Sequence, residues 1–387
     1  MNFQHNLLSK LVFIFVLFLF NTAFASQVLF VYRDFGHKGD ENQVRGVIRA
    51  YAKVVNDLEV EEFNIGQEEQ LKSSVKRAIE SKEKKPIILG VGEKTVASFA
   101  DLLPFEEATT IHLCHMVTAN HPNLPGKVDF IALPLHSLGS FEDTVAHTNT
   151  QLIRTIGVSH NRQIEEICRS YDENKDNLPP RDSYLGIILA GDAPTPDNEI
   201  LVFSETNARE LARYVANILE DKHLLVINGP RTGKYDPKTL TEKKEAHRDG
   251  QKDFITQAFL DELIQSNIPE NQLSLFDFQF GVSTSQDMDF LLGTVRATNS
   301  NILVPGESTS SISECIDVLP AGAVVVYHNT AMNAVHNAHV QSELQVGRIK
   351  FLQAGFQETC EQKNHNQDIT PHFSASETIA AALSQAN

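Results

Sequence analysis

The chain has 387 residues, with 33 Lys and Arg against 50 Asp and Glu, and a formal net charge of −17. An apolar share of 41% is enough to build cores, so a chain that is disordered throughout is excluded. The acidic balance argues against a nucleic-acid-binding protein and against electrostatic attachment to an anionic membrane, because both need clusters of Lys and Arg. The length fits two or three domains.

The first 25 residues have the pattern of a secretory signal peptide. Lys10 precedes an unbroken apolar run at residues 11–20, and Ala23 and Ala25 provide the small residues of a cleavage site. The run is short for a membrane-spanning helix, which needs about 20 apolar residues. We therefore expect an exported protein, periplasmic or secreted. The alternative is a body anchored to the membrane by the uncleaved segment. No second long apolar run follows, so no stable membrane insertion of the body is expected.

The body alternates between predicted strands and predicted helices. Short apolar runs typical of strands covered on both faces lie at residues 28–32, 58–63, 86–91, 110–113, 128–133, 185–189, 224–227, 302–304 and 323–327. The segments between several of them have helical periodicity. Such alternation predicts an α/β protein with two Rossmann-like domains of similar size, each a parallel sheet with helices on both faces.

A charged segment with two prolines at residues 173–183 is the best candidate for a linker. It separates an expected N-terminal domain at residues 26–172 from a C-terminal domain at residues 184–352. Residues 353–387 are expected to form a polar tail with a surface helix.

The loop after the first predicted strand, at residues 36–43, contains two glycines that would let a ligand approach the backbone. Because ligands of open α/β sheets bind at the carboxyl ends of the strands, this position favours a binding loop. The loop lacks the G-x-G-x-x-G fingerprint of dinucleotide-binding proteins. The alternative is a simple turn in which Asp40 caps the following helix.

A second candidate loop, at residues 228–235, combines glycines with two cations. It fails the Walker A pattern, because three residues separate Gly229 from Gly233 and no Ser or Thr follows Lys234. A glycine-rich turn with Arg231 and Lys234 could still bind a diphosphate through charge-assisted hydrogen bonds. The alternative is a solvated basic loop.

The third loop, at residues 306–314, is rich in hydroxyl groups and precedes a helix, as expected for an anion-binding site. Glu314 would accept hydrogen bonds from ribose hydroxyls. The alternative is a capping box formed by Ser311 and Glu314.

The fourth candidate is His136, which follows a predicted strand and could act as a general base. The alternative is a polar surface residue. No metal site is expected from the other histidines, and the four cysteines show no C-x-x-C spacing. Cys114 and Cys315 fit buried free thiols, with one or two disulfides as the alternative.

Taken together, these loops resemble the mitochondrial-fission ELM-type family of glycosyltransferase-like proteins, which has a GT-B architecture, in which two Rossmann-like domains face each other across a cleft. The resemblance rests on six short segments in the same order. They are Gly39, Glu41, Asn42 and Gln43 of the first loop, residues 92–95 (GEKT), residues 134–137 (PLHS), residues 157–162 (GVSHNR), residues 230–232 (PRT) and residues 307–314 (ESTSSISE). Asp40 stands where the family has His, Ser137 where it has Asp, and Glu307 where it has Asp.

The resemblance implies that the C-terminal domain binds the nucleotide part of a nucleotide sugar. The residues it implies there are Gly229, Arg231, Thr232, Glu307, Ser308, Ser310, Ser313 and Glu314, with Glu314 on the ribose and Arg231 on the diphosphate. It implies that Gly39, Glu41, Asn42 and Gln43 form an acceptor-side loop, with His136 also on the acceptor side as the catalytic residue. No cofactor and no metal are expected, because GT-B enzymes stabilise the leaving diphosphate with backbone N–H groups and helix dipoles.

Three functions follow from these expectations. The first is a metal-independent GT-B-like glycosyltransferase with a nucleotide-sugar donor. The second is an exported, non-catalytic GT-B-like protein that binds this or a related anionic ligand, or a protein partner. The altered His and Asp positions favour it, and so does the export signal, because nucleotide sugars are cytoplasmic. The third is a hydrolase or epimerase that acts on a sugar in the same cleft.

Overall fold

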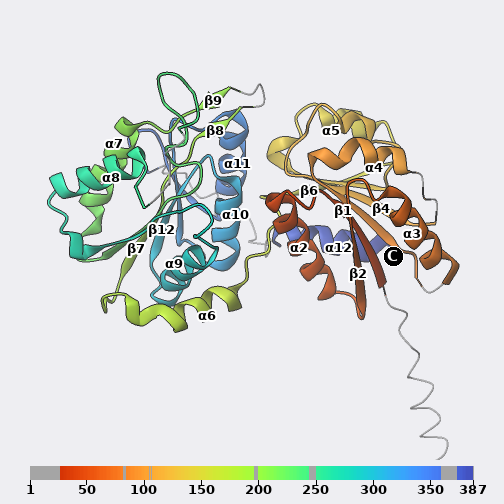
Figure 1. The fold of residues 1–387 in the computed structure, drawn as a ribbon, viewed down its shortest axis with the longest axis horizontal. Helices are drawn as coiled ribbons and strands as arrows, with labels where there is room; N and C mark the ends of the chain where they lie inside the picture. Colours follow the sequence, from red (N-terminus) through yellow and green to blue (C-terminus); the bar gives the residue numbers. More distant parts are fainter. Residues whose placement is uncertain are drawn as a thin grey trace, which may run out of the picture. The chain divides into compact units, whose positions relative to one another are not determined.

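The computed structural model describes residues 27–81, 84–103, 105, 107–195, 199–243, 250–358 and 373–386. The predicted signal peptide lies outside these residues. Among them, no helix is long and apolar enough to cross a membrane. The structure divides into two compact units, each built on its own six-stranded sheet (Figure 1).

Unit 1 contains a sheet with the strand order β2-β1-β3-β4-β5-β6, and the pairings from β2 to β5 are parallel. Its strands are β1 (Gln27–Arg33), β2 (Leu58–Asn64), β3 (Ile87–Val91), β4 (Thr109–Leu113), β5 (Phe130–Pro134) and β6 (Gln151–Thr155). Its helices are α2 (Lys38–Ala52), α3 (Glu68–Ser81), α4 (Val96–Leu102) and α5 (Phe141–Ala146). The central strands are buried along their whole length, as their continuous apolar runs predicted.

Unit 2 contains a parallel sheet with the order β11-β10-β7-β12-β13-β14. Its strands are β7 (Tyr184–Ile188), β10 (His223–Ile227), β11 (Leu273–Phe276), β12 (Asn301–Pro305), β13 (Val324–Tyr327) and β14 (Lys350–Leu352), beside a small ribbon of β8 (Ala193–Pro194) and β9 (Ile200–Leu201). Its helices are α6 (Ile164–Asn174), α7 (Glu205–Leu219), α8 (Phe254–Gln265), α9 (Gln286–Ala297), α10 (Thr309–Val318) and α11 (Ala334–Gln345). Both sheets confirm the predicted α/β class.

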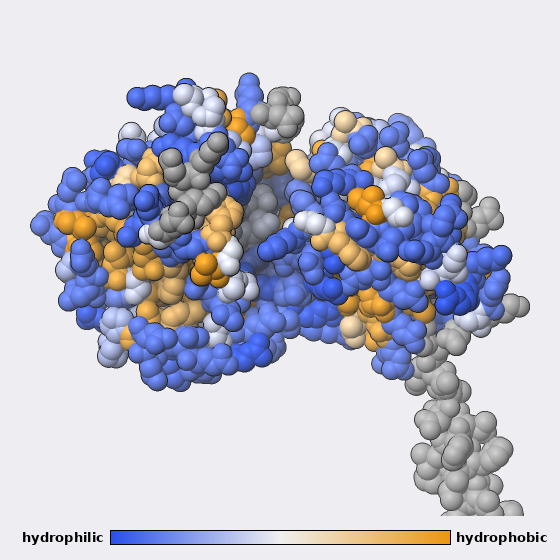
Figure 2. All heavy atoms as spheres, viewed as in Figure 1, coloured by the Kyte–Doolittle hydropathy of each residue, from blue (hydrophilic) through white to orange (hydrophobic). Residues whose placement is uncertain are grey.

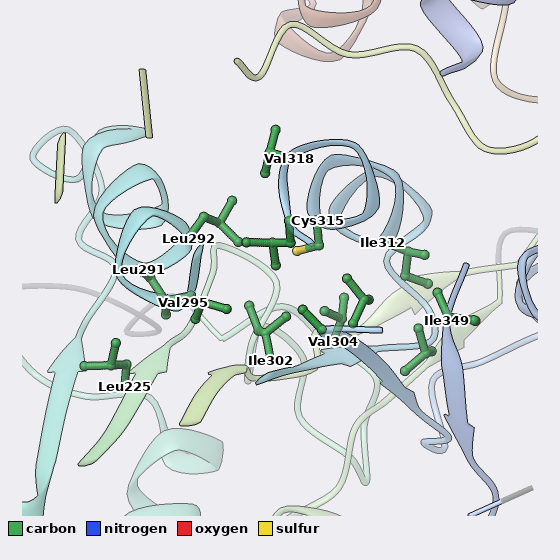
Figure 3. Packing of buried hydrophobic residues seen from close by; sticks show 14 of the residues in the cluster. Leu225, Leu291, Leu292, Val295, Ile302, Val304, Ile312, Cys315, Val318 and Ile349 are labelled. Atoms are coloured by element: carbon green, nitrogen blue, oxygen red, sulfur yellow. The ribbon is translucent and has the colours of Figure 1, made fainter. Parts of the chain in front are cut away.

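Each face of the unit 2 sheet has its own apolar core. In one core, Leu292 and Val295 of α9 and Cys315 of α10 pack against Ile302 and its neighbours on β12 (Figure 3). The other core lies beneath α7 and α8. Cys315 and Cys114 are buried free thiols, which confirms one of the two alternatives predicted from the sequence. On the face in view, most of the surface is hydrophilic, and apolar residues gather in patches on each unit (Figure 2).

The change from unit 1 to unit 2 does not fall at the predicted linker. Unit 1 comprises the described part of Met1–Ala132, with Ser140–Ile153 and Glu377–Asn387, and unit 2 comprises Leu133–Gly139 and Arg154–Ser376. The chain therefore enters unit 2 about 20 residues before residue 173. The reason is α6, which packs against α9 so closely that a Cβ on Gly293 would lie 2.1 Å from the carbonyl oxygen of Ile167.

The polar tail also differs from its prediction. The expected helix is present as α12 (Ala375–Ala386), but it is not a surface helix. Ile379, Ala380 and Leu383 are each at most 1% exposed and pack into the core of unit 1, which Figure 1 shows as the blue helix beside β1 and β2. The last helix of the chain thus completes the unit formed by the first residues.

Candidate functional site

The candidate nucleotide site lies in unit 2, where four adjacent parallel strands end. In the order β10-β7-β12-β13, the carboxyl ends lie at one edge of the sheet, and a loop follows each strand. The strand order changes direction at β7, because the next strands in the sequence, β10 and β11, lie on one side of β7 and the later strands β12, β13 and β14 lie on the other. Such a topological switch point is where open α/β sheets bind ligands.

Glu307 joins three of these loops. Its carboxylate accepts hydrogen bonds from the backbone N–H of Gly191 after β7 (2.8 Å) and from the side-chain amide of Asn329 after β13 (2.6 Å). The side chain is buried, and this burial raises the pKa of the carboxyl group, while the two hydrogen bonds and the charge of Arg231 oppose the rise. Glu307 therefore fixes the loop backbone in place and leaves no free carboxylate toward solvent.

The loop after β10 is a closed turn that presents Arg231. Thr232 is buried, its backbone N–H donates to the Gly229 carbonyl (3.0 Å), and the Gly229 N–H donates to its hydroxyl (3.2 Å). Gly191 packs directly on this turn, because a Cβ there would lie 2.7 Å from the Cβ of Arg231. The Arg231 side chain itself is exposed and interacts electrostatically with Glu307 and His336. The turn therefore carries an available guanidinium at the sheet edge.

The third loop gives its helix a different start from the one expected. α10 begins at Thr309 after the N-cap Ser308, so the predicted capping box of Ser311 and Glu314 is not formed. Ser308 donates to the hydroxyl of Ser311 (2.8 Å), and Ser310 is exposed in the first turn. The backbone N–H groups of the first turn and these hydroxyl groups lie at the start of α10. They are the groups of the predicted anion site that an anion could contact there.

Ser313 and Glu314 contact the segment at residues 157–162 and do not face the sheet edge as free side chains. The Ser313 hydroxyl accepts from the backbone N–H of Val158 (3.0 Å), and Glu314 accepts from Nε of Arg162 (2.7 Å). Arg162 also bonds Asp289 on α9. The segment at residues 157–162 and the segment at residues 307–314, which the sequence presented as separate motifs, therefore form one ion-paired structure around α10.

His136 lies on the same unit as Arg231. The structure groups Leu133–Gly139 with unit 2, where the half-buried His136 ring lies 4.5 Å from the ring of His339 on α11. His339 is fully buried, and its Nε2 lies 3.2 Å from Glu343 Oε1. One turn before it, burial lowers the pKa of His336 to about 4, with further contributions from Arg231 and His339. The first turns of α11 thus lie near both the predicted catalytic residue and the predicted diphosphate residue.

The predicted acceptor-side residues belong to unit 1 and are helical. Gly39, Glu41, Asn42 and Gln43 lie in the first turns of α2 and not in a loop. Gln43 Nε2 lies 3.4 Å from Nδ1 of His115, which follows β4, and Glu41 lies within 3.9 Å of Arg33 and Arg45. His136 belongs to unit 2, whereas the acceptor-side residues with which the resemblance grouped it belong to unit 1.

Sequence reasoning missed the partners that organise the unit 2 edge. Gly191, Asn329 and His336 carry no recognisable motif, because their contacts join strand ends far apart in the chain. Position after a predicted strand was the available signal for each of them. Among the residues that the structure describes, no group of three or more His, Cys, Asp or Glu side chains is arranged to bind a metal ion.

No protein-family model matches the sequence. No curated protein matches it either. Solved structures do match over most of the chain. One is the UDP-GlcNAc 2-epimerase from Methanocaldococcus jannaschii, with a TM-score of 0.50 and 12% identity over 93% of this chain and 100% of that one.

Two further matches have lower scores. One is the UDP-GlcNAc 2-epimerase from Neisseria meningitidis bound to UDP-GlcNAc, with a TM-score of 0.45 and 10% identity over 93% of this chain and 99% of that one. The other is an E. coli trehalose-6-phosphate protein bound with UDP-2-fluoro glucose, with a TM-score of 0.44 and 10% identity over 93% of this chain and 96% of that one. With two six-stranded α/β units, the chain has the fold of the GT-B class. The matches do not support membership in the ELM-type family.

Proposed function

We propose that this protein is a GT-B-fold enzyme that uses a nucleotide sugar, with the diphosphate bound at the carboxyl edge of the unit 2 sheet. One observation carries the proposal. The buried Glu307 ties the loops that lead into α10 and α11 to Gly191 after β7. Gly191 packs on the turn that carries the exposed guanidinium of Arg231. An Arg fork and helix N-termini are the groups that bind phosphate oxygens in proteins.

The same groups would supply the electrostatic part of the chemistry. When the sugar leaves, negative charge develops on the diphosphate, and a fixed guanidinium with oriented N–H dipoles stabilises that charge. The reaction therefore needs no metal ion in this proposal. His136, beside α11 in unit 2, is the proposed proton-transfer group on the donor side.

The ribose role of Glu314 needs revision within the proposal. Arg162 occupies Oε2 of Glu314, and the Glu314 side chain is 12% exposed. Such an ion pair holds the carboxylate in one orientation, so a ribose hydroxyl would share Glu314 with Arg162, or Glu314 would serve only to hold α10. Glu314→Gln separates these roles, because it keeps the shape but weakens the pair with Arg162.

Thermal unfolding with ligands tests the proposal. Full-length protein would be heated with UDP, GDP, UDP-glucose or UDP-GlcNAc, and a ligand at about a hundred times its Kd stabilises by about 2.7 kcal/mol. We expect a rise in Tm with at least one nucleotide, which Arg231→Ala removes and Arg213→Ala, an exposed cation on α7, retains. No shift at millimolar ligand would contradict the proposal. EDTA should leave the shift unchanged.

A second candidate function is a non-catalytic GT-B-fold protein that still binds the nucleotide. The observation that favours it is the commitment of Glu314 and Ser313 to contacts within the protein. Export at the predicted signal peptide, which we also propose, would favour it further by separating the protein from cytoplasmic donors. Nucleotide binding without turnover of any bound nucleotide sugar would support this function. A C-terminal alkaline phosphatase fusion would test export, since the reporter is active only outside the cytoplasm.

A further inference from the structure

The middle of α11 carries a histidine and a glutamate that are both completely buried. The side chains of His339 and Glu343 are 0% exposed, and Nε2 of His339 lies 3.2 Å from Oε1 of Glu343. The ring of the half-buried His136 lies 4.5 Å from the ring of His339, at an interplanar angle of 40°. All three residues belong to unit 2. A histidine that reaches solvent thus packs on one that does not.

Arg348 determines where the proton of this buried pair lies. Its Nε donates to Oε2 of Glu343 at 2.7 Å, and its Nη2 donates to Oε1 at 2.8 Å. Both carboxylate oxygens are therefore acceptors of hydrogen bonds from a guanidinium. The proton in the contact between Glu343 and His339 then belongs to Nε2 of the imidazole. In a neutral His339 this leaves Nδ1 as a bare acceptor.

Nδ1 of His339 is buried and has no hydrogen-bond partner among the described residues. Leaving a buried polar atom without a partner destabilises a protein, and a phenylalanine ring would fill a similar space without that cost. Such an exception calls for an explanation other than packing. The ring that contacts His339 from outside α11 is that of His136. We therefore looked for the explanation in the chemistry of His136.

A proton on His136 would supply the missing donor. A neutral imidazole has one N–H group, whereas an imidazolium has two. Ring centroids 4.5 Å apart are close enough for a nitrogen of each ring to come within hydrogen-bond distance. The half-buried His136 can rotate about its side-chain bonds, while Glu343 holds His339 in place.

We infer that His339 is the positioning residue of His136, because its Nδ1 accepts a hydrogen bond from His136 whenever His136 carries the proton. This inference rests on the proposed function, in which His136 is the proton-transfer group. The hydrogen bond stabilises the imidazolium form of His136 and holds its ring in one orientation. Glu343 and Arg348 act through His339, because they keep its proton on Nε2.

The other titratable groups of α11 do not offer the same acceptor. They are His336 and Glu343. Nδ1 of His336 already accepts the backbone N–H of Asn333 at 3.1 Å, which forms part of the cap of the helix. Both oxygens of Glu343 are bonded by Arg348. Among the titratable groups of α11, Nδ1 of His339 is therefore the acceptor that a proton on His136 would find.

Long-range ¹H–¹⁵N NMR of the histidines in full-length protein tests the inference, with the signals of His136 assigned from His136→Gln. In wild type we expect a protonated Nε2 and a bare Nδ1 on His339. His339→Phe keeps a ring against His136 but removes the acceptor. The midpoint of the His136 titration should then fall by about one pH unit, a tenfold loss of proton affinity. His147→Phe, at an exposed histidine of unit 1, should leave that midpoint unchanged.

A protonated Nδ1 on neutral His339 would overturn the inference, and this measurement on wild type needs no variant to fold. An unchanged His136 titration in a folded His339→Phe would overturn it as well. Where wild type releases UDP from UDP-glucose or UDP-GlcNAc, His339→Phe should lose about 10- to 100-fold in kcat with an unchanged Kd for UDP. Equal kcat would contradict the inference. Failure of wild type to bind UDP would instead refute the proposed function, and the NMR measurements would still decide the role of His339.

Discussion

Replacing Glu307 with alanine should destabilise unit 2 more than any change at its surface. The substitution leaves two buried donors without an acceptor, the Gly191 N–H and the Asn329 amide. Each unsatisfied buried group costs about 1–3 kcal/mol, so the two together cost about 2–6 kcal/mol. The variant also no longer buries a carboxylate, which offsets part of the loss. We therefore expect a net loss of about 2–4 kcal/mol.

Glu307→Gln provides the matched control, because it keeps the volume and one acceptor oxygen. We expect a smaller loss of about 1–2 kcal/mol, since the new amide group would face one of the two donors. Hydrogen exchange measured on peptides from β7, β12 and β13 assigns the change to unit 2, which a global melting curve of a two-unit protein cannot do. Exchange in both variants equal to wild type would refute the reasoning that Glu307 holds these loops.

Two further predictions concern the fold. Gly293→Ala should cost about 1–3 kcal/mol in urea unfolding, because its Cβ would meet the Ile167 carbonyl and force α6 away from α9; wild-type stability would contradict this. Burial lowers the pKa of His112 to about 3 and of His121 to about 4. Below pH 6.5 the unfolded chain therefore takes up protons that the folded protein does not, and the free energy of unfolding decreases as the pH falls toward 4. At pH 4 the loss from His121 is about 3 kcal/mol, and His121→Asn should flatten the measured dependence on pH.

The sequence predicted the central strands because burial on both faces leaves a continuous apolar run. It missed β6, β11 and β14, three edge strands that are short or only partly apolar. The linker prediction failed for a different reason. The residues around α6 are mostly polar, so the sequence showed no sign that this helix packs on α9. The contact between Ile167 and Gly293 joins segments that are far apart in the chain.

The candidate site was predicted in position but not in detail. Arg231 lies at the edge where the strand pattern placed it, and its turn follows from Gly229 and Thr232. The partner of Glu314 could not be foreseen, because Arg162 is 152 residues away in the chain. Likewise, the sequence offered a binding loop or a turn with Asp40 as the cap at residues 36–43, whereas the structure begins α2 at Lys38 with His37 as the N-cap.

Calorimetric titration of full-length protein with UDP tests the central claim most directly. The account predicts saturable binding that weakens by about 10- to 100-fold in Arg231→Ala, the loss of one charge-assisted hydrogen-bonding group, while Arg213→Ala binds as wild type does. Absence of UDP binding in wild type, or equal affinity in Arg231→Ala, would contradict the placement of a nucleotide diphosphate at the unit 2 sheet edge.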